Sequence, residues 1–130
     1  MNYAGNLWFK TFIMDQTLPF SESIESDGTV YISGQIGVDP ATNTLPAAGF
    51  AAEADQVMKN LGSVLHRQGL DYGDLVNVTI YLKSMENYSA ANTEYRKYFN
   101  GRFPARVCIA VHDLPLNANI EIAGIARRKN

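Results

Sequence analysis

The chain has 130 residues, of which 46% are hydrophobic and 18% are charged, and its formal net charge at pH 7 is −2. These values fit one folded domain over residues 1–130 and exclude an intrinsically disordered chain. They also exclude the strongly basic surface with which many proteins attract nucleic acid or an anionic membrane, so neither is an expected partner.

The N-terminal part contains an apolar stretch, residues 7–14, that is interrupted by Lys10. Because no basic region precedes a clean apolar core, we interpret this stretch as a strand and not as a secretory signal. No run of about 18 apolar residues is present to span a membrane. The single cysteine, Cys108, cannot form a disulfide within the chain, which favours a reducing compartment. We therefore expect a cytoplasmic protein.

A β-hairpin is predicted next, because residues 20–26 and 29–34 flank the dipeptide Asp27-Gly28. Asp-Gly between two strand-like runs is the strongest short signal for a tight hairpin turn. Residues 34–46 contain glycine, proline and asparagine at short intervals and predict a loop. The glycines Gly34 and Gly37 in this loop lack the basic residue and the following helix of a phosphate-binding motif.

Two segments predict helices. In residues 51–69, apolar side chains recur at intervals of three and four, and Gly69 supplies the end. The second segment, about residues 86–99, carries a mostly apolar stripe that includes the polar Asn92. A polar group in such a stripe needs a partner. Asn92 is therefore as well suited to holding a neighbouring loop as to contacting a ligand.

Three later segments, residues 76–82, 106–112 and 120–127, predict strands by their alternating pattern. In the first, one side is expected to carry the apolar residues Val76, Val78, Ile80 and Leu82. Two helices cannot cover both faces of a sheet of five or six strands. We therefore expect an α+β fold in which both helices cover one face of a mixed sheet.

The last two strands predict what lies on the uncovered face. We expect Val107 and Ile109 to face the core, which turns Arg106 and Cys108 to the other side. Ile120 and Ile122 should face the helices, so that Glu121 lies on the Arg106 side. The remaining residues of that side are apolar, namely Ala110, Ala123 and Ile125. Such a face predicts self-association of the chain.

Arg106 has two interpretations that the sequence leaves open. It could be a structural arginine whose charge Glu121 neutralises. It could instead receive the carboxylate of a ligand, because a guanidinium matches a carboxylate with two parallel hydrogen bonds. In that case Glu121 could hold a water molecule and accept its proton.

The other chemically reactive side chains give weaker signals. Cys108 is more simply a buried, inert cysteine than a nucleophile, since no histidine pairs recognisably with it. His66 is predicted in a helix and His112 at a strand end, with no spacing typical of a metal site. We therefore expect no metal and no cofactor.

The chain resembles the reactive-intermediate deaminase family, also called RidA or YjgF, from about Pro19 to Ala126. Each matching segment is short, but their order and spacing together are specific. The segments are ISGQIGVDP (residues 32–40), Asn60-Leu61, VNVTIYL (76–82), Asn92-x-x-Tyr95-x-x-Tyr98-Phe99, PAR (104–106), DLP (113–115) and IEIAGIA (120–126).

This resemblance implies a chorismate-mutase-like fold and a homotrimer whose sheets form a central barrel, with three sites between subunits. It implies hydrolysis of enamine and imine intermediates, such as 2-aminoacrylate, to a 2-keto acid and ammonia, with no cofactor. Arg106 matches the arginine that clamps the substrate carboxylate, aided by backbone groups around Ser33, Gly34 and Cys108. Glu121 matches the glutamate that positions the attacking water, and Asn92 matches an asparagine near the site.

The segment at residues 18–22 departs from the family pattern. Many members carry a tyrosine and a glutamine where this chain has Phe20 and Glu22. Phe20 keeps the ring but cannot hydrogen-bond, and Glu22 adds a negative charge. We therefore predict weaker hydrolysis of 2-aminoacrylate than in members with the tyrosine, or a preference for another imino acid.

Two other functions compete with the deaminase. A non-catalytic protein could use the same Arg106 pocket to bind or sense small 2-keto acids. The ribonuclease label attached to the family is disfavoured, because the net charge is −2 and the sequence lacks a histidine pair or basic stripe suited to RNA cleavage.

Overall fold

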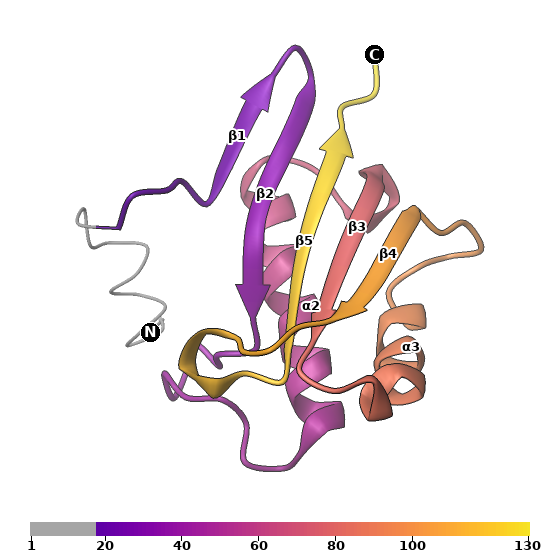
Figure 1. The fold of residues 1–130 in the computed structure, drawn as a ribbon. Helices are drawn as coiled ribbons and strands as arrows, with labels where there is room; N and C mark the ends of the chain where they lie inside the picture. The colour runs from indigo at the N-terminus through magenta and orange to yellow at the C-terminus, as the bar shows by residue number, and fades with distance from the viewer. Residues whose placement is uncertain (1–17) are drawn as a thin grey trace.

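A computed structural model describes residues 18–130. In this part of the chain, five strands form one sheet in the order β1-β2-β5-β3-β4, with two helices packed against it (Figure 1). The strands are β1 Ser23–Ser26, β2 Thr29–Ile36, β3 Leu75–Leu82, β4 Ala105–Ala110 and β5 Ile120–Arg127. The helices are α2 Phe50–Arg67 and α3 Tyr88–Arg96, and the short 3-10 turns are η1 Tyr72–Asp74, η2 Met85–Asn87 and η3 Pro115–Asn117. The strand predicted at residues 7–14 lies outside the described residues.

The predicted hairpin and the end of the first helix are confirmed. Asp27 and Gly28 adopt positive φ angles of 51° and 81° and join β1 to β2. Such angles are those that a two-residue hairpin turn requires. Gly69 follows α2 with φ of 72°, where a residue with a side chain would be strained.

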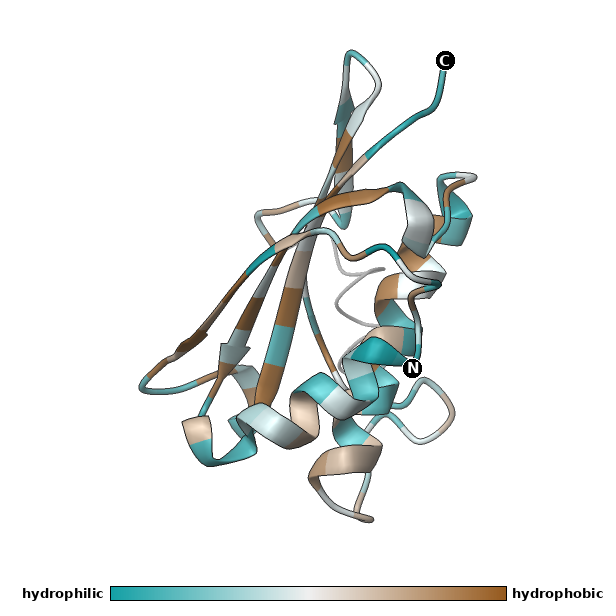
Figure 2. Cartoon of the chain, turned by 90° about the vertical axis from the view of Figure 1, so that its right-hand side faces the viewer, coloured by the Kyte–Doolittle hydropathy of each residue, from teal (hydrophilic) through white to brown (hydrophobic). Residues whose placement is uncertain are grey.

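The sheet is mixed, as predicted, because β3 and β4 are parallel while the other neighbours are antiparallel. Parallel strands need a long crossover, and α3 supplies it. Viewed from the β4 side, both helices lie on one side of the sheet (Figure 2). This arrangement confirms the α+β fold with two helices on one face.

The main core lies between this face of the sheet and the helices. Its fully buried members come from α2, β2, β3 and β5, and include Val30, Met58, Leu61, Leu65, Ile80, Leu82, Ile120 and Ile122. Val76 was expected on the same side of its strand as Val78, Ile80 and Leu82, but it is 42% exposed whereas those three are fully buried. A β-bulge between Leu75 and Asn77 shifts the register, so that Leu75 takes the buried position instead.

The prediction for the two sides of β4 was wrong. Val78 pairs with Arg106 and Ile80 with Cys108, so Arg106 and Cys108 share the helix-covered face with the buried residues of β3. Val107 and Ile109 point the other way and are 54% and 44% exposed. Both sides of β4 are largely apolar. The alternation of side chains along the strand therefore does not indicate which side the helices cover.

The uncovered side of the sheet, here called the open face, carries Tyr31, Val107, Ile109, Glu121 and Ile125, as the strand pairing shows. At its lower end in Figure 1, the connection from β4 to β5 crosses in front of the strands. A small second cluster of Ile36, Val38 and Ala118 is buried there. The rest of the open face has no cover within the described part of the chain.

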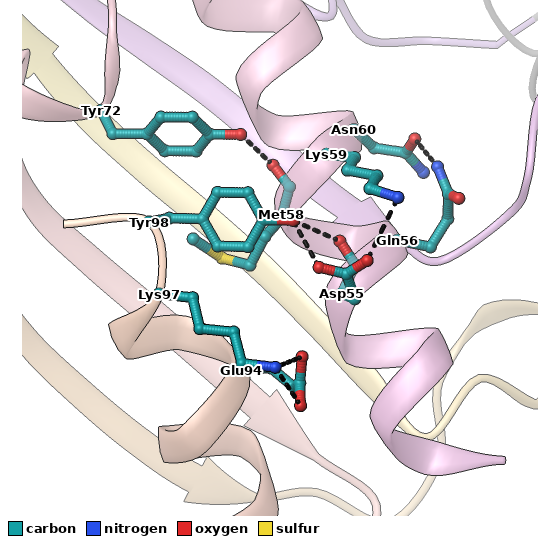
Figure 3. Close-up of polar contacts among 9 residues, drawn as sticks. All are labelled: Asp55, Gln56, Met58, Lys59, Asn60, Tyr72, Glu94, Lys97 and Tyr98. Atoms are coloured by element: carbon teal, nitrogen blue, oxygen red, sulfur yellow. Dashed lines mark hydrogen bonds and ion pairs between the residues drawn. The ribbon is translucent and has the colours of Figure 1, made fainter.

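A polar network joins the end of α3 to α2 (Figure 3). The Tyr72 hydroxyl donates a 2.7 Å hydrogen bond to the Met58 carbonyl, and the Tyr98 hydroxyl donates to the Asp55 carboxylate. Lys59 pairs with the same carboxylate at 3.2 Å. The Tyr98 contact ties the residues just after α3 to the first half of α2.

Candidate functional site

The Arg106 guanidinium lies over the aromatic rings of α3. Its Cζ atom is 5.0 Å from the centroid of the Tyr95 ring and 5.8 Å from that of Tyr88. It also donates a long, 3.5 Å hydrogen bond to the Tyr88 hydroxyl. No carboxylate of residues 18–130 forms an ion pair with it. Aromatic faces hold the cation in place while leaving much of its hydrogen-bonding capacity free.

Arg106 and Asn92, both predicted site residues, line one pocket of about 230 Å³. Three further lining residues, Tyr95, Arg96 and Phe103, were not predicted as site residues. Tyr95 and Phe103 stack with ring centroids 6.3 Å apart at an interplanar angle of 18°. Tyr95 and Arg96 follow Asn92 by three and four positions, a spacing that places them on the same side of a helix. That spacing could have identified them from the sequence.

Glu121 lies on the other side of the sheet. It pairs with Tyr81, whereas the neighbouring Ile122 pairs with Ile80 on the helix-covered side. The prediction that Glu121 shares a side with Arg106 was therefore wrong. It had assigned Val107 and Ile109, and not Arg106, to the helix-covered side of β4. Strand β3 separates β5 from β4, which places the two backbones about 10 Å apart. One chain does not present both residues to one small ligand.

Nothing in the described part of the chain neutralises the Glu121 carboxylate. No cation or hydrogen-bond donor among residues 18–130 pairs with it, and partial burial raises the pKa of the carboxyl above its ordinary value of 4.5. A carboxylate with a raised pKa is a stronger proton acceptor than a fully exposed one. The hypothesis that it forms a structural ion pair with Arg106 finds no support within one chain.

Ser33 and Gly34 form a β-bulge beside Glu121. The pairing of β2 with β5 shifts between Ile32 and Gln35. A Cβ atom on Gly34 would lie 1.9 Å from an oxygen of Glu121, so only glycine leaves room for the carboxylate in this position. The predicted residues thus form two groups in one chain, with Arg106 and Asn92 on one side and Gly34 and Glu121 on the other.

The bulge is tied to the segment that departs from the family pattern. The Ser33 hydroxyl donates a 2.6 Å hydrogen bond to the Ser21 carbonyl, and its backbone N–H donates to the Glu22 carbonyl at 3.0 Å. The Glu22 carboxylate accepts two hydrogen bonds from Arg67, at 2.6 and 3.0 Å. Its negative charge is therefore neutralised by α2. Phe20, in the same segment, is 53% exposed.

Cys108 lies half-buried against the main core. Burial raises the pKa of its thiol, although the nearby Arg106 charge acts in the opposite direction. A thiol with a raised pKa is a poor nucleophile at neutral pH. The geometry is that of an inert cysteine, in line with the sequence interpretation.

Residues 18–130 contain neither a cluster of candidate metal ligands nor a candidate membrane-spanning helix. No group of three or more histidine, cysteine or acidic side chains is placed to hold a metal ion. No helix in the same range is long and apolar enough to cross a membrane.

Comparisons with a family model, with related sequences and with solved structures all point to the same family. A family model described as endoribonuclease L-PSP matches residues 13–128. A mouse protein named 2-iminobutanoate/2-iminopropanoate deaminase is 40% identical over 108 residues, which cover 83% of this chain and 80% of the mouse protein. The human protein of the same name is also 40% identical, over 79% of its length. The crystal structure of the Escherichia coli YjgF gene product superposes with a TM-score of 0.82 at 34% identity, covering 87% of this chain and 91% of that one.

Proposed function

Because the chain belongs to the RidA/YjgF family of L-PSP proteins, we propose that it hydrolyses imines of short 2-keto acids to the keto acid and ammonia. The observation that carries this proposal is the Arg106 guanidinium, which lies in a pocket without a carboxylate partner from residues 18–130. Relatives that carry the deaminase name align with 83% of the chain.

Arg106 would bind the substrate carboxylate. A planar guanidinium binds a carboxylate with two parallel hydrogen bonds, which fixes the orientation of the attached imine carbon. The Tyr95 and Tyr88 rings hold the cation before the ligand arrives, so that less side-chain entropy is lost on binding. Asn92, which lines the same pocket, offers a hydrogen-bonding amide.

Glu121 would come from a neighbouring copy of the chain. The two residues lie on opposite sides of one sheet, so a site containing both requires a second copy. We propose a homotrimer whose sheets surround a central barrel, with each Arg106 pocket facing a neighbour's Glu121 and Gly34. This assembly would also cover the exposed apolar residues of the open face.

The chemistry needs one water molecule and no cofactor. Glu121 takes a proton from the water as the water oxygen attacks the carbon of the C=N bond, and it passes this proton to the imine nitrogen. In the resulting aminoalcohol the hydroxyl proton moves to the amino nitrogen, the C–N bond breaks with its electron pair going to nitrogen, and ammonia leaves as the carbonyl forms. The protein accelerates the reaction mainly by holding the water molecule close to the imine carbon in the correct orientation.

A coupled assay tests the proposal. A dehydratase generates 2-aminoacrylate from serine, and pyruvate formation is followed with wild type, Arg106→Ala, Arg106→Lys and a surface control, Lys129→Ala, whose side chain is 86% exposed. We expect acceleration by wild type and the control, and a loss of about a hundredfold in Arg106→Ala. Arg106→Lys should recover only part of the activity, because an ammonium lacks the planar fork. Unchanged turnover by Arg106→Ala would refute the carboxylate clamp.

The second candidate is a non-catalytic protein that binds 2-keto acids. Phe20 favours it, because the family's tyrosine hydroxyl is absent from that position. Binding of a keto acid without acceleration of imine decay would select this alternative.

Phe20→Tyr tests the importance of the missing hydroxyl. If that hydroxyl supports the reaction, Phe20→Tyr should raise turnover of 2-aminoacrylate by a fewfold above wild type, since one added hydrogen bond contributes about 1 kcal/mol. Equal turnover of the two proteins in the coupled assay would show that the hydroxyl has no role in this chain.

A further inference from the structure

Three arginines without a carboxylate partner surround Phe103. Within residues 18–130, the cations that form no ion pair with a carboxylate are Arg96, Arg102, Arg106 and Arg127. Arg127 is engaged elsewhere, since it donates to the Asp27 carbonyl and the Thr29 hydroxyl. The other three line two adjoining pockets that share Phe103 and Pro104. A chain of net charge −2 thus collects unpaired positive charge at one place.

Two of these arginines, Arg96 and Arg106, line the same pocket of about 230 Å³. The Arg96 Cζ atom lies 5.8 Å from the centroid of the Phe103 ring, and the Arg106 Cζ atom lies 5.0 Å from that of Tyr95. Since these two rings stack on each other, the guanidinium groups are held on neighbouring rings. Two like charges on one small pocket repel each other, and a ligand with two negative groups would relieve that repulsion.

We infer that this pocket selects substrates with a second carboxylate, namely imines of short 2-keto dicarboxylic acids. The inference rests on the proposed deaminase function and extends it to the substrate side chain. Arg106 binds the carboxylate next to the imine carbon, and Arg96 binds the carboxylate at the far end of the side chain. Phe103 and Tyr95 supply an apolar wall for the methylene groups between them.

Binding of stable keto acids tests this selectivity without requiring turnover. The affinities of 2-oxoglutarate, a dicarboxylate, and 2-oxobutanoate, a monocarboxylate, are measured by calorimetry at low and high salt. Wild type should bind the dicarboxylate about fivefold more tightly, as expected for one partly exposed ion pair, and this preference should shrink as salt rises. Arg96→Gln should lower the affinity for 2-oxoglutarate more than the affinity for 2-oxobutanoate, and so remove the preference.

Arg102→Gln is the matched control. It removes the same charge from the adjoining pocket, close to Phe103 but outside the pocket that contains Arg106. We expect it to leave the preference for the dicarboxylate intact. An equal loss in Arg96→Gln and Arg102→Gln would mean that only the general positive potential attracts the second charge, and would overturn the inference.

The outcomes separate this inference from the proposed function. If 2-oxobutanoate binds in an Arg106-dependent manner and 2-oxoglutarate binds no more tightly, the second carboxylate site is refuted while the clamp stands. If Arg96→Gln keeps the full preference for 2-oxoglutarate, Arg96 is only a solvated surface residue and the inference also fails. If neither acid binds wild type, both the clamp and the inference are wrong.

Discussion

At the scale of single residues, neither Arg106 nor Glu121 forms an ion pair with another residue of the described range, 18–130. A buried or half-buried charge normally has an opposite charge or several hydrogen bonds nearby. Arg106 rests on aromatic faces, and the Glu121 carboxylate lies against the backbone bulge at Gly34. Groups left in such a state are typical of binding and catalytic sites, where the ligand completes the interactions.

The raised pKa of Glu121 predicts the pH dependence of the reaction. A general base must be ionised, so kcat/KM should fall as pH drops through the pKa of this carboxyl. Because burial raises that pKa, the fall should be centred above 4.5, the ordinary value for a glutamate. Glu121→Gln should lower kcat/KM by about a hundredfold and abolish this fall. Measurement of kcat/KM against pH for both proteins checks the prediction, and an unaltered acid limb in Glu121→Gln would assign the titration to another group.

At the scale of elements, the bulge in β2 determines where the Glu121 carboxylate lies. A methyl group on Gly34 would occupy the position of a Glu121 oxygen, yet that oxygen ends a flexible side chain that can rotate away. We therefore expect Gly34→Ala to lower kcat by about tenfold to a hundredfold through misplacement of the carboxylate. The free energy of unfolding should change by less than about 0.5 kcal/mol.

Gly73→Ala serves as the control for Gly34→Ala. Nothing lies within 4 Å of a Cβ atom at Gly73, so the same chemical change meets no neighbour there. Steady-state kinetics and urea unfolding of both variants separate the two effects. A Gly34→Ala protein with wild-type kcat would show that the position of Glu121 does not limit the reaction.

The sequence was sufficient to predict which segments form helices and strands. It was not sufficient to predict which side of some strands faces the helices. The hairpin at Asp27-Gly28 and the end of α2 at Gly69 depend on local backbone preferences, which a sequence shows directly. The bulge that exposes Val76 depends on pairing with β5, a contact between distant residues. Both sides of β4 are largely apolar, and which side faces the helices depends on the packing of α3 over Arg106.

The candidate site was predictable only in part for the same reason. Arg106, Asn92 and Glu121 were identified from side-chain chemistry and family resemblance. Their division between two sides of the sheet follows from the strand register, which no local pattern in the sequence encodes. The aromatic support of Arg106 by Tyr95 likewise appears only when α3 packs against β4.

At the scale of the whole molecule, the open face exposes several apolar side chains of the described strands. Tyr31, Val107 and Ile109 are 49%, 54% and 44% exposed on it. Exposed apolar side chains gathered on one sheet face mark an interface. Val107→Lys places a charge there, on the side of β4 opposite to Arg106, and should convert the proposed trimer to a monomer with loss of deaminase activity.

Met85→Lys is the matched control for this change. Met85 is 46% exposed, close to the value for Val107, but it lies in η2, outside the sheet. Light scattering coupled to size-exclusion chromatography gives the mass of each variant, and circular dichroism verifies that each is folded. A monomeric wild type, or a Val107→Lys protein of unchanged mass, would refute the proposed assembly through this face.

The placement of Arg106 and Glu121 on opposite sides of one sheet has a genetic consequence under the proposed assembly. Each copy gives its arginine to one site and its glutamate to a different one. Two alleles that are each inactive, one lacking the arginine and one lacking the glutamate, would then complement each other when expressed in the same cell. An allele lacking both would impair the product of a normal allele by entering the same assemblies.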